Sequence, residues 1–338
     1  MTELFELNND TLADYLQTVI PNFEGPLTSE KFAGGQSNPT YLLTTAGKKY
    51  VLRRKPPGKL LPGAHAIDRE YKVLSALADT DVPVAPVLHL CEDDDVIGSM
   101  FYVMEHMDGR VLWLPNLPEQ SAAERGEIYT EMNRVLAALH SVDVDAVGLS
   151  DFGKKGGYFE RQIRTWTKQY HAAETRSISK VDQLIEWLPA NMPMDDGKVS
   201  IAHGDFRLDN MMFHPTENTV IALLDWELST IGHPYADLAY QCMQYHLPQG
   251  QGMPGLGGCD LAELGIPSEQ EFIDMYCQRM GYDKIENWNF YLAFCLFRLA
   301  AICQGIEKRR QIGTASSEKA AQYGALVEPL ATIATNLI

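Results

Sequence analysis

The sequence is short of positive charge. Its 338 residues include 28 Lys and Arg against 45 Asp and Glu, which gives a formal net charge of −17. A surface this acidic repels phosphate backbones, so nucleic-acid binding is not expected to be the main activity. It would tolerate a cationic ligand, although a high net charge most often serves solubility alone.

Targeting and disulfide signals are also missing. The first thirty residues contain no Lys or Arg, which a signal or transit peptide would need. Six cysteines are present without a C-x-x-C pair, so zinc spacing is absent and we expect reduced core residues of a cytoplasmic protein. The most apolar run, residues 290–297, ends at Arg298. It is too short to cross a membrane, so we expect a buried helix and no membrane contact.

What is present is an ordinary globular composition, 45% hydrophobic and 22% charged, with a length that suggests about two domains. Periodicity predicts helices at 10–20 and 66–78 and strands at 28–34, 38–46, 49–54, 86–90 and 100–105. Helical patterns follow at 119–141, 158–176, 180–190, 234–246, 268–280, 287–311 and 316–337, interrupted by a hairpin of 211–213 and 220–224. We therefore expect an α+β fold, with a small antiparallel-sheet lobe, residues 1–107, and a larger helical lobe, residues 108–338.

The strongest chemical signal is one run of residues and a later aspartate. The run reads His203-Gly204-Asp205-Phe206-Arg207-Leu208-Asp209-Asn210, and Asp225 follows the hairpin. Phosphoryl transfer needs a carboxylate that orients an acceptor hydroxyl and takes its proton, and oxygen ligands that hold Mg²⁺ against the phosphates. Asp205, Asn210 and Asp225 supply one base and two ligands of these kinds.

This pattern resembles the aminoglycoside phosphotransferase and choline kinase group, relatives of the protein kinases. In that group the loop reads H-G-D-x-x-x-x-N, and a metal-binding Asp precedes an aromatic residue, here Trp226. The resemblance implies a two-lobe protein-kinase-like fold and ATP and Mg²⁺ as cofactors. It implies that Asp205 is the base, that Asn210 and Asp225 bind the metal, and that Asp237 supports the catalytic loop.

The first lobe is then expected to hold the nucleotide. Gly34 and Gly35 lie between two predicted strands, where a loop of backbone N–H groups could cover phosphates. Gly35, Ser37 and Asn38 are therefore candidates for nucleotide binding. No Walker A loop occurs, and two glycines alone would more often form only a hairpin turn.

The strand at 49–54 is expected to carry the phosphate-binding cation. In kinases this strand ends with a Lys that contacts the α- and β-phosphates. Alternation puts Arg53 on one face of the strand and Arg54 on the other. We expect Arg53 to contact the phosphates, with Arg54 or Lys55 also open. Glu70, on the next helix, is expected to fix Arg53, against the alternative of a solvated surface residue.

Two further assignments follow from the kinase-like fold. Residues 104–107 correspond to the hinge, whose backbone contacts adenine, so Glu105 and Met107 are candidates for main-chain contacts. His203 is expected to support the catalytic loop by a local hydrogen bond rather than to act as a base.

Other segments narrow the resemblance to one branch, the kinase-like domains fused to acyl-CoA dehydrogenases. They read GGQSNPTY, LRRKPPG, AHAIDRE and GYFERQIRTW, beginning at residues 34, 52, 64 and 157. This branch implies a hydroxy acid or a hydroxyacyl-CoA thioester as acceptor, so the expected partner is a small molecule with a hydroxyl group, with or without CoA.

An anionic acceptor would need positive charge nearby. Arg161, Arg164 and Lys168 lie at helical spacing on one side of a predicted helix. Arg161, Arg164 and Trp166 are therefore candidates to contact the acceptor, against the alternative of a solvated basic face. Arg207, inside the catalytic loop, could face the acceptor or the transferring phosphate and is a second catalytic candidate.

Other functional classes stay open. A catalytically silent nucleotide-binding module would be expected to have lost Asp205, Asn210 or Asp225, and all three are present. An antibiotic- or choline-type kinase with a cationic acceptor suits the net charge, but it would line its acceptor site with acids. A protein kinase is disfavoured because H-R-D and A-P-E segments are missing. The sequence does not fix the acceptor, the choice of ATP or GTP, or the oligomeric state.

Overall fold

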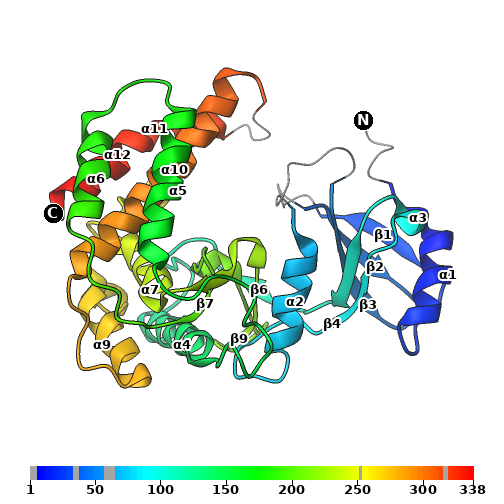
Figure 1. Cartoon of the computed structure of the whole chain (residues 1–338). Helices are drawn as coiled ribbons and strands as arrows, with labels where there is room; N and C mark the ends of the chain where they lie inside the picture. The colour runs from blue at the N-terminus through cyan, green and yellow to red at the C-terminus, as the bar shows by residue number, and fades with distance from the viewer. Residues whose placement is uncertain (1–5, 33–37, 57–64, 251–252, 315–318) are drawn as a thin grey trace. The chain divides into compact units, whose positions relative to one another are not determined.

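A computed structural model of the chain describes residues 6–32, 38–56, 65–250, 253–314 and 319–338 (Figure 1). The chain divides into two compact units. One unit comprises Met1–Gly109 and Ile221–Glu227, and the other comprises Arg110–Val220 and Leu228–Ile338.

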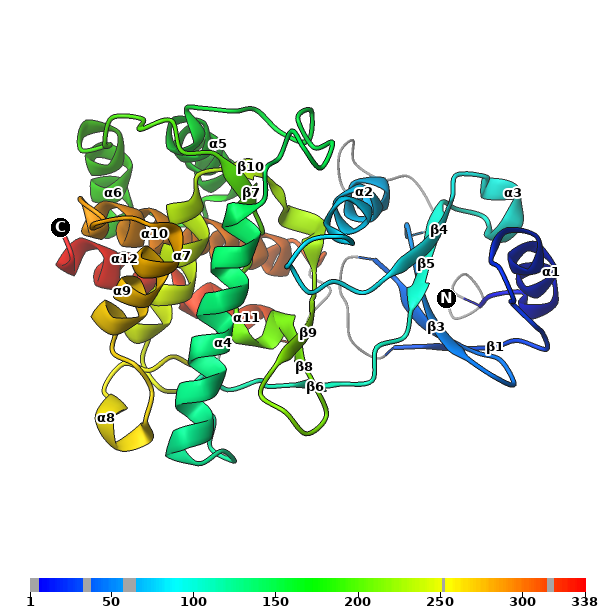
Figure 2. The same cartoon turned by 90° about the horizontal axis from the view of Figure 1, so that it is seen from below.

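The first unit is built on a five-stranded sheet with the order β1-β2-β3-β5-β4, in which all neighbours are antiparallel. The strands are β1 (Thr28–Lys31), β2 (Thr40–Thr44), β3 (Lys49–Arg54), β4 (Val87–Cys91) and β5 (Phe101–Glu105). Helix α1 (Asn9–Val19) packs on one face, and α2 (Ile67–Leu77) lies against β4 and β5 on the other, as Figure 2 shows. The short α3 (Asp94–Ile97) connects β4 to β5.

Side-chain alternation explains this layering. On β3, Tyr50 and Leu52 are buried in a core that includes the apolar residues of α1. Arg53 points to the other face, where it meets Glu70 of α2. The sheet therefore has an apolar side under α1 and a side toward α2 that carries charged residues.

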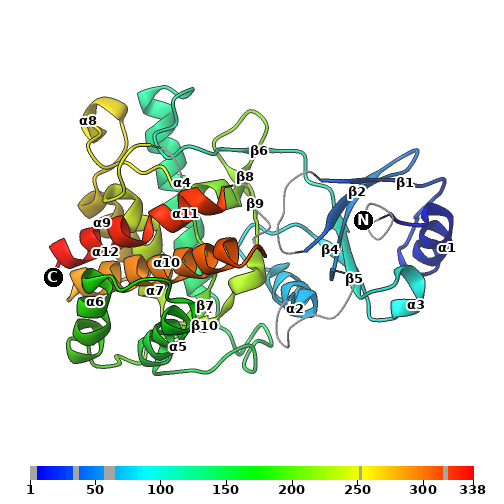
Figure 3. The same ribbon diagram turned by 90° about the horizontal axis from the view of Figure 1, so that it is seen from above.

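The second unit is mainly helical. Its helices are α4 (Ala122–Ser141), α5 (Tyr158–Ala173), α6 (Ser179–Ala190), α7 (Pro234–Cys242), α8 (Leu261–Leu264), α9 (Glu269–Met280), α10 (Trp288–Gln311), α11 (Ala320–Ala325) and α12 (Val327–Asn336). Helix α10 contacts α5, α6, α7, α11 and α12, and Figure 3 shows it between α5 and α12. By length and composition α10 could cross a membrane, but 78% of its apolar window is buried inside the protein. The buried helix expected from the sequence is thereby confirmed.

Short strands hold the loops of the second unit. β7 (Ser200–Ala202) pairs antiparallel with β10 (Thr230–Gly232), and β6 (Arg110–Val111) pairs antiparallel with β8 (Met211–Phe213). The segment 203–210 thus begins where β7 ends and stops where β8 begins. β9 (Val220–Leu223) follows β8 along the chain and ends two residues before Asp225.

Most expected elements are present with ends shifted by a few residues, and the antiparallel sheet followed by helices confirms the α+β prediction. All six cysteines are free and five are buried, as expected. Five short elements were not predicted, namely α3, α8, β6, β7 and β10. Segments of two to four residues are too short to show a helical or strand-like hydrophobic period. The helix expected at 316–337 is instead two helices, α11 and α12, in its described part.

Candidate active site

Arg53 and Glu70 form a buried ion pair in the first unit, as predicted. Arg53 Nε lies 2.7 Å from Glu70 Oε2, and the two side chains are 14% and 3% exposed. Burial alone would lower the pKa of Arg53, but Glu70, with smaller contributions from Tyr102 and Asp225, raises it above its ordinary value. The guanidinium therefore keeps its charge in this position.

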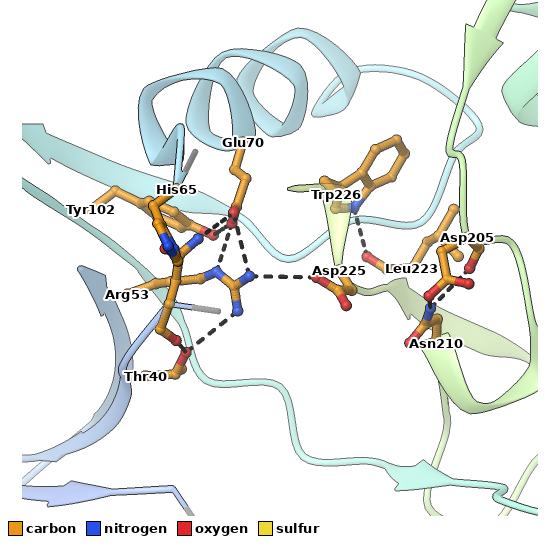
Figure 4. Close-up of polar contacts among 11 residues, drawn as sticks. Thr40, Arg53, His65, Glu70, Tyr102, Asp205, Asn210, Leu223, Asp225 and Trp226 are labelled. Carbon is orange, nitrogen blue, oxygen red and sulfur yellow. Dashed lines mark hydrogen bonds and ion pairs between the residues drawn. The ribbon is translucent and has the colours of Figure 1, made fainter. Parts of the chain in front are cut away.

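Glu70 is the centre of a wider hydrogen-bond network, drawn in Figure 4. Asn38 Nδ2 donates to Glu70 Oε1 at 2.9 Å, and the Tyr102 hydroxyl donates to Oε2 at 3.2 Å. His65 Nδ1 lies 3.0 Å from Asn38 Oδ1. Burial raises the pKa of Tyr102, so its hydroxyl keeps its proton and remains a donor. The network fixes Glu70 and, through it, Arg53, and the Asn38 side chain takes part by supporting this pair.

The other two cations that the sequence left open have different partners. Arg54 is buried on the opposite face of β3, where it donates to a hydroxyl and a backbone carbonyl near α3 at 2.9 Å each. Lys55 Nζ lies 3.5 Å from a carboxylate oxygen of Asp68. Arg53 is thus the cation of the three that pairs with Glu70, which agrees with the alternation read from the sequence.

Asp225 belongs to the same unit and contacts the same guanidinium. Its Oδ1 is 3.4 Å from Arg53 Nη2, and its side chain is 40% exposed. Its φ is +63°, a left-handed value that is uncommon outside glycine and is often found at functional positions. Trp226 is buried, and its indole N–H donates to the Leu223 carbonyl at 2.9 Å (Figure 4). These contacts fix the turn that carries the carboxylate.

In the second unit, Asp237 holds the start of the catalytic loop. Its carboxylate accepts hydrogen bonds from the backbone N–H groups of His203 at 2.6 Å and Gly204 at 2.9 Å. Burial alone would raise the pKa of Asp237, but His140, His203 and the Gly204 N–H hold it below its ordinary value. The support expected from Asp237 is therefore confirmed.

Two further local features shape the loop. His203 Nδ1 accepts a hydrogen bond from the Asp205 N–H at 3.3 Å, which confirms its predicted supporting role. Gly204 has a φ of +84°, and a Cβ at this position would lie 2.8 Å from the carbonyl oxygen of Leu228. Only glycine fits this close approach without a shift of the backbone.

Asp205 and Asn210 lie together, as the five-residue step between them suggested. Asn210 Nδ2 donates to the Asp205 carbonyl oxygen at 2.8 Å and to its carboxylate Oδ2 at 2.9 Å (Figure 4). A 3₁₀ turn, Leu208–Asn210, closes the step. Asp205 Oδ1 lies 3.4 Å from Arg207 Nε. The carboxylate is thus fixed through Oδ2, while Oδ1 lies near a positive charge.

Arg207 is part of the catalytic loop and lines a cavity. Its Nη2 donates to Asp209 Oδ2 at 2.7 Å. Burial alone would lower its pKa, but Tyr240, Asp205 and Asp209 raise it, so the side chain stays charged. The cavity has a volume of about 110 Å³. It is lined by the polar residues Arg207, Asp209 and Gln244 together with apolar residues such as Trp113, Met243, Leu247 and Met253.

Tyr240 of α7 is a further residue near the catalytic loop that was not predicted from the sequence. Burial, with the Asp205 carboxylate nearby, raises the pKa of its hydroxyl well above its ordinary value. Tyr240 follows Asp237 by three residues, so both lie on one face of a helix. This spacing is the signal by which a second contact from α7 to the catalytic loop could have been found.

The hinge candidates lie at the end of β5. The Glu105 N–H donates to the Pro86 carbonyl at 2.9 Å, and the Glu105 carboxylate pairs with Lys48. Met107 follows outside any helix or strand, and its main-chain N–H and C=O have no hydrogen-bond partner within the described part of the chain. Gly35 and Ser37 lie outside the described residues.

The acceptor candidates on α5 have varied surroundings. Arg161 donates to two backbone carbonyls in the loop before the helix. Arg164 is exposed. Trp166 is half-buried, and its ring lies 5.5 Å from the guanidinium carbon of Arg298 on α10. The acceptor contacts assigned to these residues stay predictions.

The two metal-ligand candidates offer suitable oxygen atoms. Both hydrogen bonds of the Asn210 side chain use its nitrogen, which leaves Oδ1 for another partner. The Asp225 carboxylate is partly exposed, and within the described part of the chain its ion pair is with Arg53 at 3.4 Å. Hard oxygen donors of this kind, completed by phosphate oxygens and water, fit Mg²⁺.

Comparison with known proteins identifies related chains. A family model described as the phosphotransferase enzyme family matches residues 28–272. Mouse acyl-CoA dehydrogenase family member 10 is 49% identical over 327 residues, which are 96% of this chain and 30% of the mouse protein. Mouse acyl-CoA dehydrogenase family member 11 is 45% identical over 326 residues, which are 95% of this chain and 42% of that protein. The chain therefore spans less than half the length of these relatives.

Solved structures agree with this result. A Ralstonia eutropha protein assigned to the aminoglycoside phosphotransferases is 51% identical, with a TM-score of 0.91 and coverage of 98% of both chains. Choline kinase from Cryptosporidium parvum is 14% identical, with a TM-score of 0.62 and coverage of 98% of both chains. This second likeness shows the fold alone, which is the kinase-like fold expected from the sequence. The expected branch is confirmed by the two acyl-CoA dehydrogenase family members.

Proposed function

The chain belongs to the phosphotransferase enzyme family, and we propose that it is an ATP- and Mg²⁺-dependent kinase for a small hydroxylated acid. The acceptor is a hydroxy acid or its CoA thioester. The reaction transfers the γ-phosphoryl group of ATP to the acceptor hydroxyl and releases ADP.

Asp205 orients the acceptor hydroxyl and accepts its proton. The freed oxygen forms a bond to the γ-phosphorus, and the bond from that phosphorus to the β,γ-bridging oxygen breaks, so that ADP leaves. Arg207, 3.4 Å from Asp205, supplies positive charge beside the reacting oxygen atoms.

The first unit binds the nucleotide. Arg53, held by Glu70, contacts the phosphates, and the free main-chain groups of Met107 contact the base. Asn210 and Asp225 hold Mg²⁺, which neutralises charge on the phosphates when it is bound. The left-handed backbone at Asp225 supports this assignment, because such strained conformations are often found at functional positions.

One observation carries the proposal. The Asn210 amide is bonded to the Asp205 carboxylate by its nitrogen, with its oxygen left over, while Asp237 holds the start of the same loop. A base fixed in this way, next to an available metal-binding oxygen, suits phosphoryl transfer better than it suits a structural turn. A silent binding module would not need to keep this arrangement.

The acceptor class rests on two further points. The two mouse relatives are named acyl-CoA dehydrogenase family members, which favours an acyl substrate. The cavity beside Arg207 has both polar and apolar walls, which suits a molecule that carries a polar group on a short hydrocarbon chain, and the guanidinium suits an anion. Neither point distinguishes the free acid from the CoA thioester.

The experiment that tests this proposal measures ADP release with Mg²⁺–ATP across a panel of acceptors. The panel holds straight-chain hydroxy acids, their CoA thioesters, choline and an aminoglycoside. Turnover of the acids or thioesters alone supports the proposal. Turnover of choline or the aminoglycoside alone would keep the kinase and refute the acceptor class. ATP binding without turnover of any acceptor would favour a silent module.

A further inference from the structure

Arg298 is a charged residue in the apolar centre of the second unit. It lies on α10, and it is 6% exposed. Arginine stays protonated under all ordinary conditions, and a buried charge without a partner is strongly unfavourable. The position therefore needs an explanation that packing alone does not provide.

Two aromatic rings enclose the guanidinium. Its central carbon lies 5.5 Å from the ring of Trp166 on α5 and 5.4 Å from the ring of Tyr240 on α7. Both helices pack on α10, as Figure 3 shows for α5. Ring faces stabilise a cation, but they do not satisfy N–H groups. The two rings therefore stabilise the charge of Arg298 but do not account for the hydrogen bonds that its N–H groups can donate.

The guanidinium of Arg298 has no carboxylate partner among the described residues. Among the described residues, no carboxylate lies within 4.0 Å of the guanidinium, and the buried Nε has no hydrogen-bond partner. Burial alone would lower the pKa of Arg298, but Tyr158, Tyr240, Cys295 and the Asp205 carboxylate raise it above its ordinary value. Asp205 of the catalytic loop is therefore close enough to Arg298 for an electrostatic interaction, although no ion pair joins the two residues.

We propose that Arg298 is an acceptor-specificity residue, whose clamped guanidinium binds a carboxylate of the substrate while the substrate hydroxyl meets Asp205. This inference rests on the proposed kinase function and names the group that the enzyme recognises. A planar guanidinium fixed between rings is suited to two parallel hydrogen bonds with a carboxylate.

Electrostatics gives the same assignment a physical reason. An acid substrate would bring a negative charge toward Asp205 in a chain whose net charge is already −17. A buried cation near Asp205 offsets that repulsion, and its effect is strong because little water screens it. A cationic acceptor would instead be repelled by the buried charge of Arg298.

Trp166 then acts as a positioning residue. Its contact with the acceptor stays a prediction, while in the structure its indole N–H donates to Gln162 at 2.9 Å and its ring lies 5.5 Å from the guanidinium carbon of Arg298. Tyr240 lies beside both parts of the site, because its ring is 5.4 Å from the guanidinium carbon of Arg298 and the nearby Asp205 carboxylate helps to raise the pKa of its hydroxyl. The base and the group proposed to bind the carboxylate thus share one neighbouring side chain.

The test compares a hydroxy acid with its uncharged carboxamide in the wild type, Arg298→Gln and Arg298→Lys. The readout is the ratio of kcat/KM for the acid to that for the amide. We expect the wild type to favour the acid and Arg298→Gln to lower the ratio by about 30-fold or more, because one partner of a buried charged pair is lost. The change should appear mainly in KM for the acid, with turnover of the amide retained.

Arg298→Lys and Arg309→Gln complete the design. Lysine keeps the charge and loses the paired geometry, so its ratio should lie between those of wild type and Arg298→Gln. Arg309 is exposed on the same helix, so Arg309→Gln removes an equal charge and should leave the ratio unchanged. Thermal melting checks folding, and Arg298→Lys provides the test if Arg298→Gln does not fold.

The outcomes separate this inference from the function on which it rests. An unchanged ratio in a folded Arg298 variant, with acid and amide both phosphorylated, would overturn the inference and keep the kinase. Turnover of cationic acceptors only, or of CoA thioesters with no turnover of the free acids, would overturn it as well, because these substrates lack the free carboxylate. Failure of the wild type to phosphorylate any hydroxylated acceptor would overturn both.

Discussion

Asp225 combines a left-handed backbone with a charge, and the two can be separated by substitution. Asparagine tolerates the same φ of +63° but cannot supply a negative oxygen, so Asp225→Asn should fold normally. We expect Mg²⁺–ATP to bind at least about tenfold more weakly, by analogy with losses of metal support. Titration calorimetry with Mg²⁺ and with EDTA measures this, since metal-free ATP should bind no worse. Equal affinities in Mg²⁺ would refute the ligand role.

The lowered pKa of the buried Asp237 carboxylate predicts that the free energy of unfolding depends on pH. Its pKa is depressed in the folded state, so its contribution is present above the unfolded pKa of about 4 and is lost as pH falls through the folded value. Asp237→Asn places an amide opposite two N–H donors and should cost about 1–3 kcal/mol at pH 7. Urea unfolding at pH 7 and pH 3 should show this cost shrinking in acid.

A matched control for that series is Asp283→Asn, because Asp283 is exposed. Its free energy of unfolding should stay within about 0.5 kcal/mol of wild type at both pH values. A cost for Asp237→Asn that is the same at pH 3 as at pH 7 would show that shape, rather than charge, holds the loop.

At the scale of elements, the catalytic loop depends on a glycine next to β10. Gly204→Ala introduces a Cβ 2.8 Å from the Leu228 carbonyl and also disfavours the φ of +84°. Gly148 has a φ of +76° with nothing within 4 Å of its Cβ position. Gly148→Ala should therefore measure only the cost of a positive φ in alanine, about 1 kcal/mol of the free energy of unfolding. We expect Gly204→Ala to cost more than this and to lower kcat. Chemical unfolding and steady-state rates measure both, and equal costs for the two variants would contradict the close approach.

Elements with a clear period or a local motif were predictable. Alternation along β3 separated Arg53 from Arg54, and the five-residue step joined Asp205 to Asn210, because both depend only on neighbours in the chain. Tyr240 and Arg298 were not found, since their roles arise where α5, α7 and α10 pack together. The predicted helix at 287–311 contains Arg298, but a single Arg after an apolar run does not indicate that its side chain is buried.

At the scale of the whole molecule, chain order and spatial grouping differ. Ile221–Glu227 groups with the first unit although it follows half of the second in sequence, and this grouping is how Asp225 reaches Arg53. The sequence singled out Asp225 in this segment as an oxygen ligand, but nothing in it indicated that the segment groups with the first unit. The chain also spans only 30% and 42% of the two mouse relatives, which carry further sequence beyond a domain of this kind.

The central claim is that Asp205 drives phosphorylation of an acceptor hydroxyl, and identification of the product tests it most directly. Phosphorus NMR of a reaction with Mg²⁺–ATP and a hydroxy acid should show a new phosphate monoester and ADP in equal amounts. Asp205→Ala should form this ester at least about 100-fold more slowly, with ATP affinity nearly unchanged. Ester formation at the wild-type rate by Asp205→Ala, or ADP with inorganic phosphate and no ester, would contradict the account.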